Sequence, residues 1–210
     1  MEELDLLKRD WKKNEHAFSQ LSETEIYKML HKKSSSIVKW IMIISVLELI
    51  LWTVVGLLGN TDDFLANIGQ DWVTVFFKTL NVFHYIVIVV LIYLFYKNYV
   101  RISTTASTKD LMHDILRTRK TVKFYVWYNL VMMALSLIVG FAINLKYNPE
   151  IHQMLEKFNE NTGFMAGVMF GMAICMIVIV GLFWLFYRLL YGILLRRLLS
   201  NYKELKKIDL

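Results

Sequence analysis

Four long apolar blocks, separated by polar segments, dominate the pattern of this chain. The blocks cover residues 38–58, 75–96, 122–145 and 164–195. An α-helix needs roughly 20 residues to cross the hydrocarbon core of a bilayer, and each block reaches that length. The pattern therefore predicts an all-α protein, a bundle of four transmembrane helices joined by three polar loops.

Composition supports a membrane protein. The chain is 56% hydrophobic and has a mean hydropathy of +0.43, whereas soluble domains are about 45–50% apolar. The first apolar block is too long for the apolar region of a cleaved signal peptide, and no A-x-A cleavage site follows it. We expect this block to stay in the membrane as a signal anchor.

Positive charge alternates along the chain in step with the blocks. Lys and Arg are abundant in residues 1–36, in the loop 97–121 and in the tail 196–210. The loop 59–74 has none, and the loop 146–163 has more acidic than basic residues. Because cytoplasmic segments carry the excess of Lys and Arg, the pattern predicts cytoplasmic termini and an outward position for the first and third loops.

The two halves of the chain resemble each other. Residues 86–96 match residues 177–187 at most positions, and Val38-Lys39-Trp40 recurs as Val122-Lys123-Phe124. Ser22 and Glu25 form a capping-box pattern, of which Ser107 and Asp110 are a weaker version. The likeness predicts two tandem repeats of a cytoplasmic helix and a transmembrane hairpin, related by a pseudo-twofold axis along the membrane normal. Chance similarity between apolar helices is the alternative.

The predicted organisation has four parts. A cytoplasmic amphipathic arm covers residues 1–36, and the first transmembrane hairpin covers residues 37–100. The second cytoplasmic helix and hairpin cover residues 101–195, and a basic cytoplasmic tail covers residues 196–210.

The N-terminal arm carries a narrow seam at spacings of three and four residues. Its members are Leu4, Leu7, Trp11, Asn14, Phe18 and Leu21, of which the first five are the candidate docking positions. Such a seam is typical of a helix that lies on the membrane or the bundle, or that docks a protein partner. An Asn in the seam fixes register against another helix and gives nothing to lipid, which favours the docking interpretation.

Polar side chains interrupt the first two apolar blocks. Glu48 lies midway along the first. His84 lies in the second, with Asn81 one turn outward from it and Lys78 another turn beyond. A carboxylate at the centre of a span costs about 2.5–3.5 kcal/mol. We expect Glu48 to face the bundle near the midplane and to pair with His84 in a structural role. A proton or cation relay and a neutral, lipid-facing Glu48 are the alternatives.

Small residues form stripes on the third and fourth blocks. The stripes are Gly163, Gly167, Gly171 and Cys175 on the fourth block, and Ser136 and Gly140 on the third. Small residues four apart let another helix approach closely, so these positions predict helix packing. The partner is either a helix of this chain or a second copy.

Motifs for catalysis and cofactor binding are absent from the sequence. The chain has no P-loop, dinucleotide turn, H-E-x-x-H, C-x-x-C or nucleophile elbow, and its five histidines are scattered. The sequence predicts no enzyme, no catalytic or metal site, no cofactor and no nucleic-acid partner.

The N-terminal sequence resembles a group of known proteins. The run Leu4-x2-Leu7-Lys-x2-Trp11-Lys, followed by Ser22-x2-Glu25-Ile26, resembles small uncharacterised four-span bacterial membrane proteins of the membrane-bound anti-sigma type. The resemblance implies a location in the bacterial inner membrane and a regulatory role.

Two functions remain open from the sequence. The first is a regulatory or scaffolding membrane protein that docks a cytoplasmic partner through its N-terminal helix. The alternative is a small transporter or channel that uses Glu48 as a coupling carboxylate. The candidate partners are the lipid bilayer, a cytoplasmic protein and a second copy of the chain.

Overall fold

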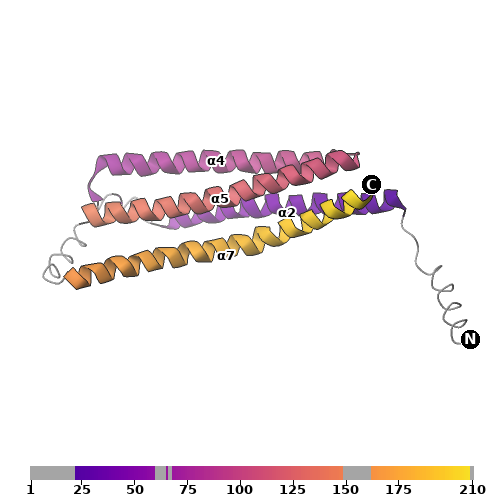
Figure 1. The fold of residues 1–210 in the computed structure, drawn as a ribbon. Coiled ribbons are helices and arrows are strands. Elements are labelled where there is room, and N and C mark those ends of the chain that lie inside the picture. Colours follow the sequence, from indigo (N-terminus) through magenta and orange to yellow (C-terminus); the bar gives the residue numbers. More distant parts are fainter. Residues whose placement is uncertain (1–21, 60–64, 66–67, 149–161, 209–210) are drawn as a thin grey trace, which may run out of the picture.

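The computed structural model describes residues 22–59, 65, 68–148 and 162–208 (Figure 1). Within these ranges the chain forms four long helices and no strand. They are α2 (Glu23–Leu58), α4 (Asp71–Thr104), α5 (Thr108–Tyr147) and α7 (Thr162–Ile208). The prediction of an all-α four-helix bundle is therefore confirmed.

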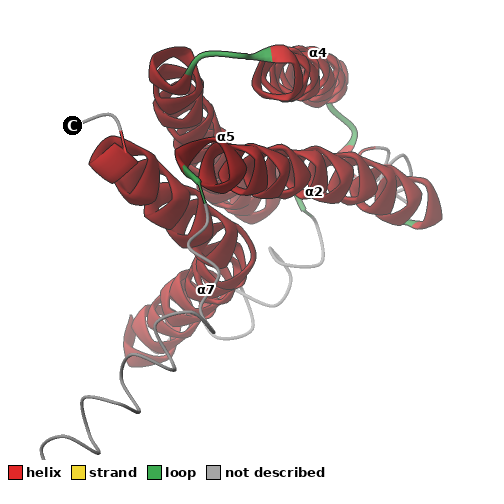
Figure 2. Cartoon of the chain, turned by 90° about the vertical axis from the view of Figure 1, so that its right-hand side faces the viewer, coloured by secondary structure: helices red, strands yellow, loops and turns green. Residues whose placement is uncertain are grey.

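The four helices run in alternating directions along one bundle axis (Figures 1 and 2). Helix α2 packs against α4 and α7, and α5 packs against the same two helices on the opposite side. Helices α2 and α5 also touch across the bundle. We call the end where α2 and α5 begin, and where α4 and α7 end, the basic end.

Each of the four helices is long and apolar enough to cross a membrane. The most apolar stretches have mean hydropathies between 2.0 and 2.6. The helices have 36, 34, 40 and 47 residues, whereas a span needs roughly 20. The chain is thus a multi-pass membrane protein whose helices exceed the thickness of the hydrocarbon core.

The first turn of α2 contains the predicted capping box. The Ser22 hydroxyl accepts a hydrogen bond from the Glu25 amide at 3.3 Å, and the Glu25 carboxylate accepts one from the Ser22 amide at 2.9 Å. These bonds to Ser22 hold the pKa of Glu25 below its usual value. At the start of α5, Ser107 makes no side-chain cap bond. The weaker capping box predicted there is not formed, in keeping with the shorter reach of Asp110.

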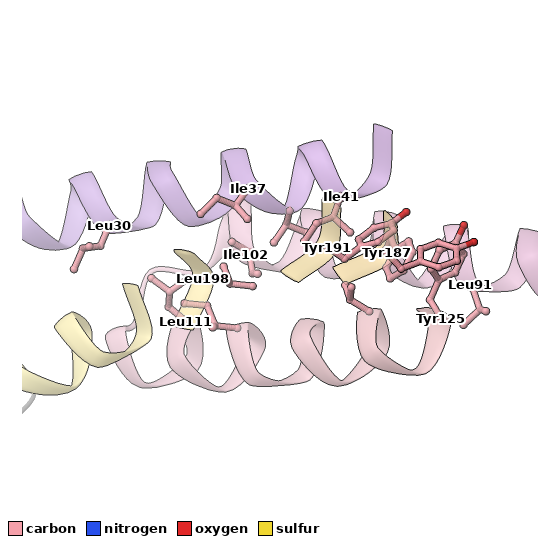
Figure 3. Close-up of a cluster of buried hydrophobic side chains, with 14 of the residues drawn as sticks. Leu30, Ile37, Ile41, Leu91, Ile102, Leu111, Tyr125, Tyr187, Tyr191 and Leu198 are labelled. Atoms are coloured by element: carbon pink, nitrogen blue, oxygen red, sulfur yellow. The ribbon is translucent and has the colours of Figure 1, made fainter. Parts of the chain in front are cut away.

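Buried side chains concentrate at the basic end of the bundle. On α2 all but Val38 recur at intervals of three and four residues: Leu30, Ser34, Ile37, Ile41, Ser45 and Glu48. Figure 3 shows Leu30, Ile37 and Ile41 of α2 facing Leu111 of α5 and Leu198 of α7. This spacing is that of a coiled-coil seam, so the basic end is a four-helix core with knob positions on every helix.

The apolar stretches farther from the basic end are mostly exposed. Only 17% of the most apolar stretch of α2 is buried, and none of that of α7 is buried. A second, smaller cluster of Leu65, Ile68, Val73 and Ile143 closes the other end of the bundle. The exposed apolar surface between the two clusters is suited to contact with lipid.

Candidate functional site

Glu48 is the carboxylate at the centre of the candidate site. It occupies the last seam position of α2 and is only 9% exposed. The prediction that Glu48 faces the bundle is therefore confirmed. The seam turns this side chain towards α5 and α7.

Three tyrosine hydroxyls donate hydrogen bonds to this carboxylate. Tyr125 of α5 donates to Oε2 at 2.7 Å, and Tyr191 of α7 donates to the same oxygen at 3.2 Å. Tyr187, one turn before Tyr191, donates to Oε1. Figure 3 shows the three tyrosine rings gathered at one level of the bundle. The arrangement links the first hairpin to both helices of the second.

The tyrosine rings also pack against one another. The ring centroids of Tyr125 and Tyr191 are 5.7 Å apart, and those of Tyr187 and Tyr191 are 6.0 Å apart. Phe95 of α4 meets Tyr125 edge-on at 5.4 Å. All four helices therefore contribute to one buried layer. A carboxylate with three donors is well satisfied, because hydrogen bonds from several hydroxyls replace its lost hydration.

His84 does not supply the hydrogen bond that the sequence predicted. Its ring stacks on Tyr128, with centroids 5.6 Å apart, and its Nδ1 has no hydrogen-bond partner among the described residues. The predicted Glu48–His84 pair is wrong, because Glu48 faces the tyrosines of α5 and α7. Asn81 and Lys78, the other two polar residues grouped with His84, are exposed.

Glu48 stands midway along its own apolar block, but its tyrosine partners stand near the ends of theirs. Its partner Tyr125 stands in the first turn of the apolar block 122–145, and Tyr187 and Tyr191 stand in the last turns of the block 164–195. Relative to the second hairpin, the carboxylate lies towards the basic end and not midway. A polar group near the end of a span is closer to water than one at its centre.

The tyrosines carried a weak signal in the sequence. Tyr187 and Tyr191 are one helical turn apart, so they share a face of α7. Tyr125 follows Lys123 as Ile41 follows Lys39, which places it on the seam-facing side of α5. Sequence reasoning missed them because a tyrosine in a span is commonly an interfacial anchor.

A small cavity adjoins the tyrosine layer. Its volume is about 190 Å³, and it is lined by Trp52, His84, Asn129, Met132, Met133, Phe183 and Tyr187. Tyr187 forms part of the wall while its hydroxyl binds Glu48. Among the described residues, no group of three or more His, Cys, Asp or Glu side chains could hold a metal ion. The cavity has room for water or a small molecule beside Tyr187, whereas Glu48 itself does not line it.

The small-residue stripes do not pack inside the chain. Gly167, Gly171 and Cys175 are exposed, and a Cβ atom added at Gly167, Gly171 or Gly140 would meet nothing within 4 Å. Ser136 is exposed as well. Of the two partners left open by the sequence, a helix of this chain is not packed against these positions, and contact with a second copy stays a prediction. The surroundings of Gly163 lie outside the described part.

The predicted docking face of the arm lies outside the described residues. That face consists of Leu4, Leu7, Trp11, Asn14 and Phe18. Docking through these positions stays a prediction.

Comparison with known proteins gives a family but no activity. Residues 24–210 match the family model "Domain of unknown function (DUF8845)", so the chain belongs to that family. No curated protein and no solved structure matches the chain.

Proposed function

We propose that this member of the DUF8845 family is a regulatory or scaffolding membrane protein that docks a cytoplasmic protein at its basic end. The observation that carries the proposal is the length of the helices beyond the apolar blocks. We call this extension the platform, made of residues 22–37, 97–121 and 196–208. A protein that only crossed the membrane would not need it.

The platform has the packing of a water-soluble helical bundle. Leu111, Ile115 and Leu198 are fully buried in it. Polar pairs also cross the helices there: Asn201 donates to the Ser34 hydroxyl at 3.0 Å, and Asn98 donates to the Thr121 hydroxyl at 3.4 Å. Buried polar pairs fix which helix faces hold together, so they favour a rigid surface for a partner.

The charge of the platform favours an acidic partner surface. Its exposed basic residues are Lys28, Lys32, Lys33, Lys97, Lys109, Arg117, Lys120, Arg196, Arg197, Lys203, Lys206 and Lys207. Acidic residues are fewer in the same segments. The N-terminal arm joins α2 at this end, so its predicted seam adds an apolar contact to a basic surface.

The proposal includes the orientation of the chain in the membrane and its location in the cell. Basic segments stay in the cytoplasm, so the basic end, with both termini, faces the cytoplasm of a bacterial inner membrane. Impermeant thiol labelling of intact cells tests this with Asn67→Cys and Lys109→Cys. We expect labelling at residue 67 and none at residue 109. Labelling at 109 alone would reverse the topology.

We also propose that the chain is a tandem repeat, and the burial of equivalent residues in the two halves supports this only in part. Val38 and Val122 are equivalent in the alignment and both are fully buried. Phe95 and Phe186 are equivalent as well, but Phe95 is fully buried and Phe186 is 46% exposed. The first helices of the two halves therefore support duplication, and the second helices do not.

Photo-crosslinking in cells tests the docking proposal. A photoreactive residue at Trp11 or Phe18 in the full chain is expected to capture a cytoplasmic protein. The matched control places the same residue at Lys8, off the seam. Crosslinks to lipid alone from both seam positions, with no protein captured, would refute docking.

A small transporter or channel remains the second candidate function. The cavity beside Tyr187 and the buried Glu48 favour it, because a coupling carboxylate needs space for its substrate. The three tyrosine donors count against it, since they occupy the carboxylate oxygens. Proton flux in proteoliposomes decides: flux in the native protein that Glu48→Gln abolishes would support transport.

A further inference from the structure

A long apolar groove runs between α5 and α7 on the membrane-facing side. Its volume is about 680 Å³. The lining residues have apolar or indole side chains: Trp127, Leu130, Val131, Ala134, Leu137, Ile138, Ala173, Met176, Ile177, Val180, Gly181 and Trp184. All lie within the two apolar blocks of the second hairpin. In a bilayer, the material that fills such a groove is hydrocarbon.

A second cavity meets the groove at its basic end. It holds about 140 Å³ and shares Trp127 and Trp184 with the groove. Its lining includes Lys123 of α5 and Arg188 of α7, and neither cavity is lined by Asp or Glu. The apolar groove therefore ends at two cations with no carboxylate between them.

The geometry of Arg188 supports a phosphate at this point. Its guanidinium lies over the Trp184 ring, 5.0 Å from the ring centroid. Stacking holds the guanidinium plane in place and leaves its edge N–H groups available for a bidentate acceptor. Tryptophan is typical of the headgroup level of a bilayer. A phosphate oxygen is the acceptor that a fixed Arg beside a Lys recognises best.

We propose that the groove binds an anionic phospholipid. One acyl chain lies along the apolar wall between α5 and α7, and the headgroup phosphate lies between Lys123 and Arg188. The site discriminates against zwitterionic lipids, because no carboxylate lines the mouth to bind a choline or ethanolamine cation. This site is independent of protein docking at the platform.

The first hairpin supplies a matched control. Lys39 and Lys97 stand at the positions that align with Lys123 and Arg188, and they line neither cavity. Replacing them removes the same charge from the same level of the bundle. A loss of lipid binding that is caused by charge alone would then appear both when Lys39 and Lys97 are replaced and when Lys123 and Arg188 are replaced.

Native mass spectrometry of the full chain in non-ionic detergent tests the headgroup contact. Phosphatidylglycerol is expected to bind about tenfold more tightly than phosphatidylcholine with identical acyl chains. Lys123→Gln with Arg188→Gln is expected to remove that preference, whereas Lys39→Gln with Lys97→Gln retains it. Equal binding of the two lipids, or equal loss in both double variants, would overturn the proposal.

A groove-filling variant tests the acyl-chain contact. Gly181 lines the groove, and a Cβ atom there meets nothing within 4 Å, so the side chain of Gly181→Phe starts in open space and adds bulk to the groove. We expect it to weaken phosphatidylglycerol binding about tenfold. The control Gly56→Phe, on an exposed position of α2 that also has nothing within 4 Å, leaves binding unchanged. Unchanged binding in Gly181→Phe, or a lipid-free dimer that this variant dissociates, would overturn the proposal.

Discussion

The platform and the membrane-spanning part of the same four helices pack in different ways. In the platform, seam residues such as Ile102 and Leu111 are fully buried. In the spanning part, Ile177 is 72% exposed and Leu57 is 80% exposed. In water, burying apolar side chains in a closed seam lowers the free energy of the folded protein. Lipid tails are as apolar as leucine, so burial away from lipid gives no such stabilisation. The comparison shows one set of helices adapting to two solvents.

Glu48 and its tyrosines lie where the two parts meet. The closed seam of α2 ends at this residue, since Glu48 is the last buried position of the helix. Beyond it the helices have an apolar surface but little packing within the chain. At the level of Glu48, the hydrogen bonds of the polar layer therefore hold α2 to α5 and α7, where the hydrophobic seam ends.

The largest stability effect is expected at this junction. Glu48→Leu leaves the hydroxyls of Tyr125, Tyr187 and Tyr191 without their acceptor, which costs about 3 kcal/mol or more. Glu48→Gln keeps one carbonyl oxygen as an acceptor and is expected to be milder. Thermal unfolding of both variants in detergent measures the difference. Equal stability of the two would show that the tyrosine layer does not hold the hairpins together.

A pair of matched truncations sharpens the contrast between the two parts. Leu111→Ala in the platform core is expected to cost about 2–5 kcal/mol, because it leaves a cavity. Ile177 on the spanning surface is mostly exposed, so Ile177→Ala removes fewer packing contacts than Leu111→Ala. It is expected to cost less than about 1 kcal/mol. Denaturation in mild detergent gives both values. Similar losses at the two sites would remove the distinction between the parts.

A smaller effect is expected from the polar pair inside the platform. Asn201→Ala removes the donor to Ser34 Oγ at a position that is fully buried, and is expected to cost about 1–2 kcal/mol. Ser200→Ala, one residue away and exposed, is the control. Unfolding monitored by circular dichroism compares them. No difference between the variants would mean that apolar seam contacts alone set the helix arrangement.

The smallest effect is expected at the first turn of α2. Ser22→Ala removes the capping box and is expected to cost about 1 kcal/mol, seen as faster amide exchange in that turn. Because the pKa of Glu25 is lowered, its contribution is present above the ordinary carboxyl pKa and is lost as the pH falls through the lowered value. Exchange rates that differ equally at acidic and neutral pH would contradict this role for Glu25.

The fold could be predicted from local sequence patterns, whereas only part of the candidate site could be predicted from them. The lengths of the apolar blocks gave four helices, and the Ser22 to Glu25 spacing gave the start of α2. Burial of Glu48 was also foreseeable, because a carboxylate in a span avoids lipid. Its partners were not foreseeable, since Tyr125 and Tyr191 are 77 and 143 residues away along the chain.

The sequence by itself determined the four long apolar helices of the described residues and the positions of the apolar and basic segments, because these properties depend on neighbouring residues and on helical rise. Only the tertiary structure decided which faces meet. Tyr96 and Tyr187 end segments that match at most positions, yet Tyr96 is 53% exposed and Tyr187 is 4% exposed. Their helices turn different faces to the bundle, and that rotation depends on every packed neighbour at once.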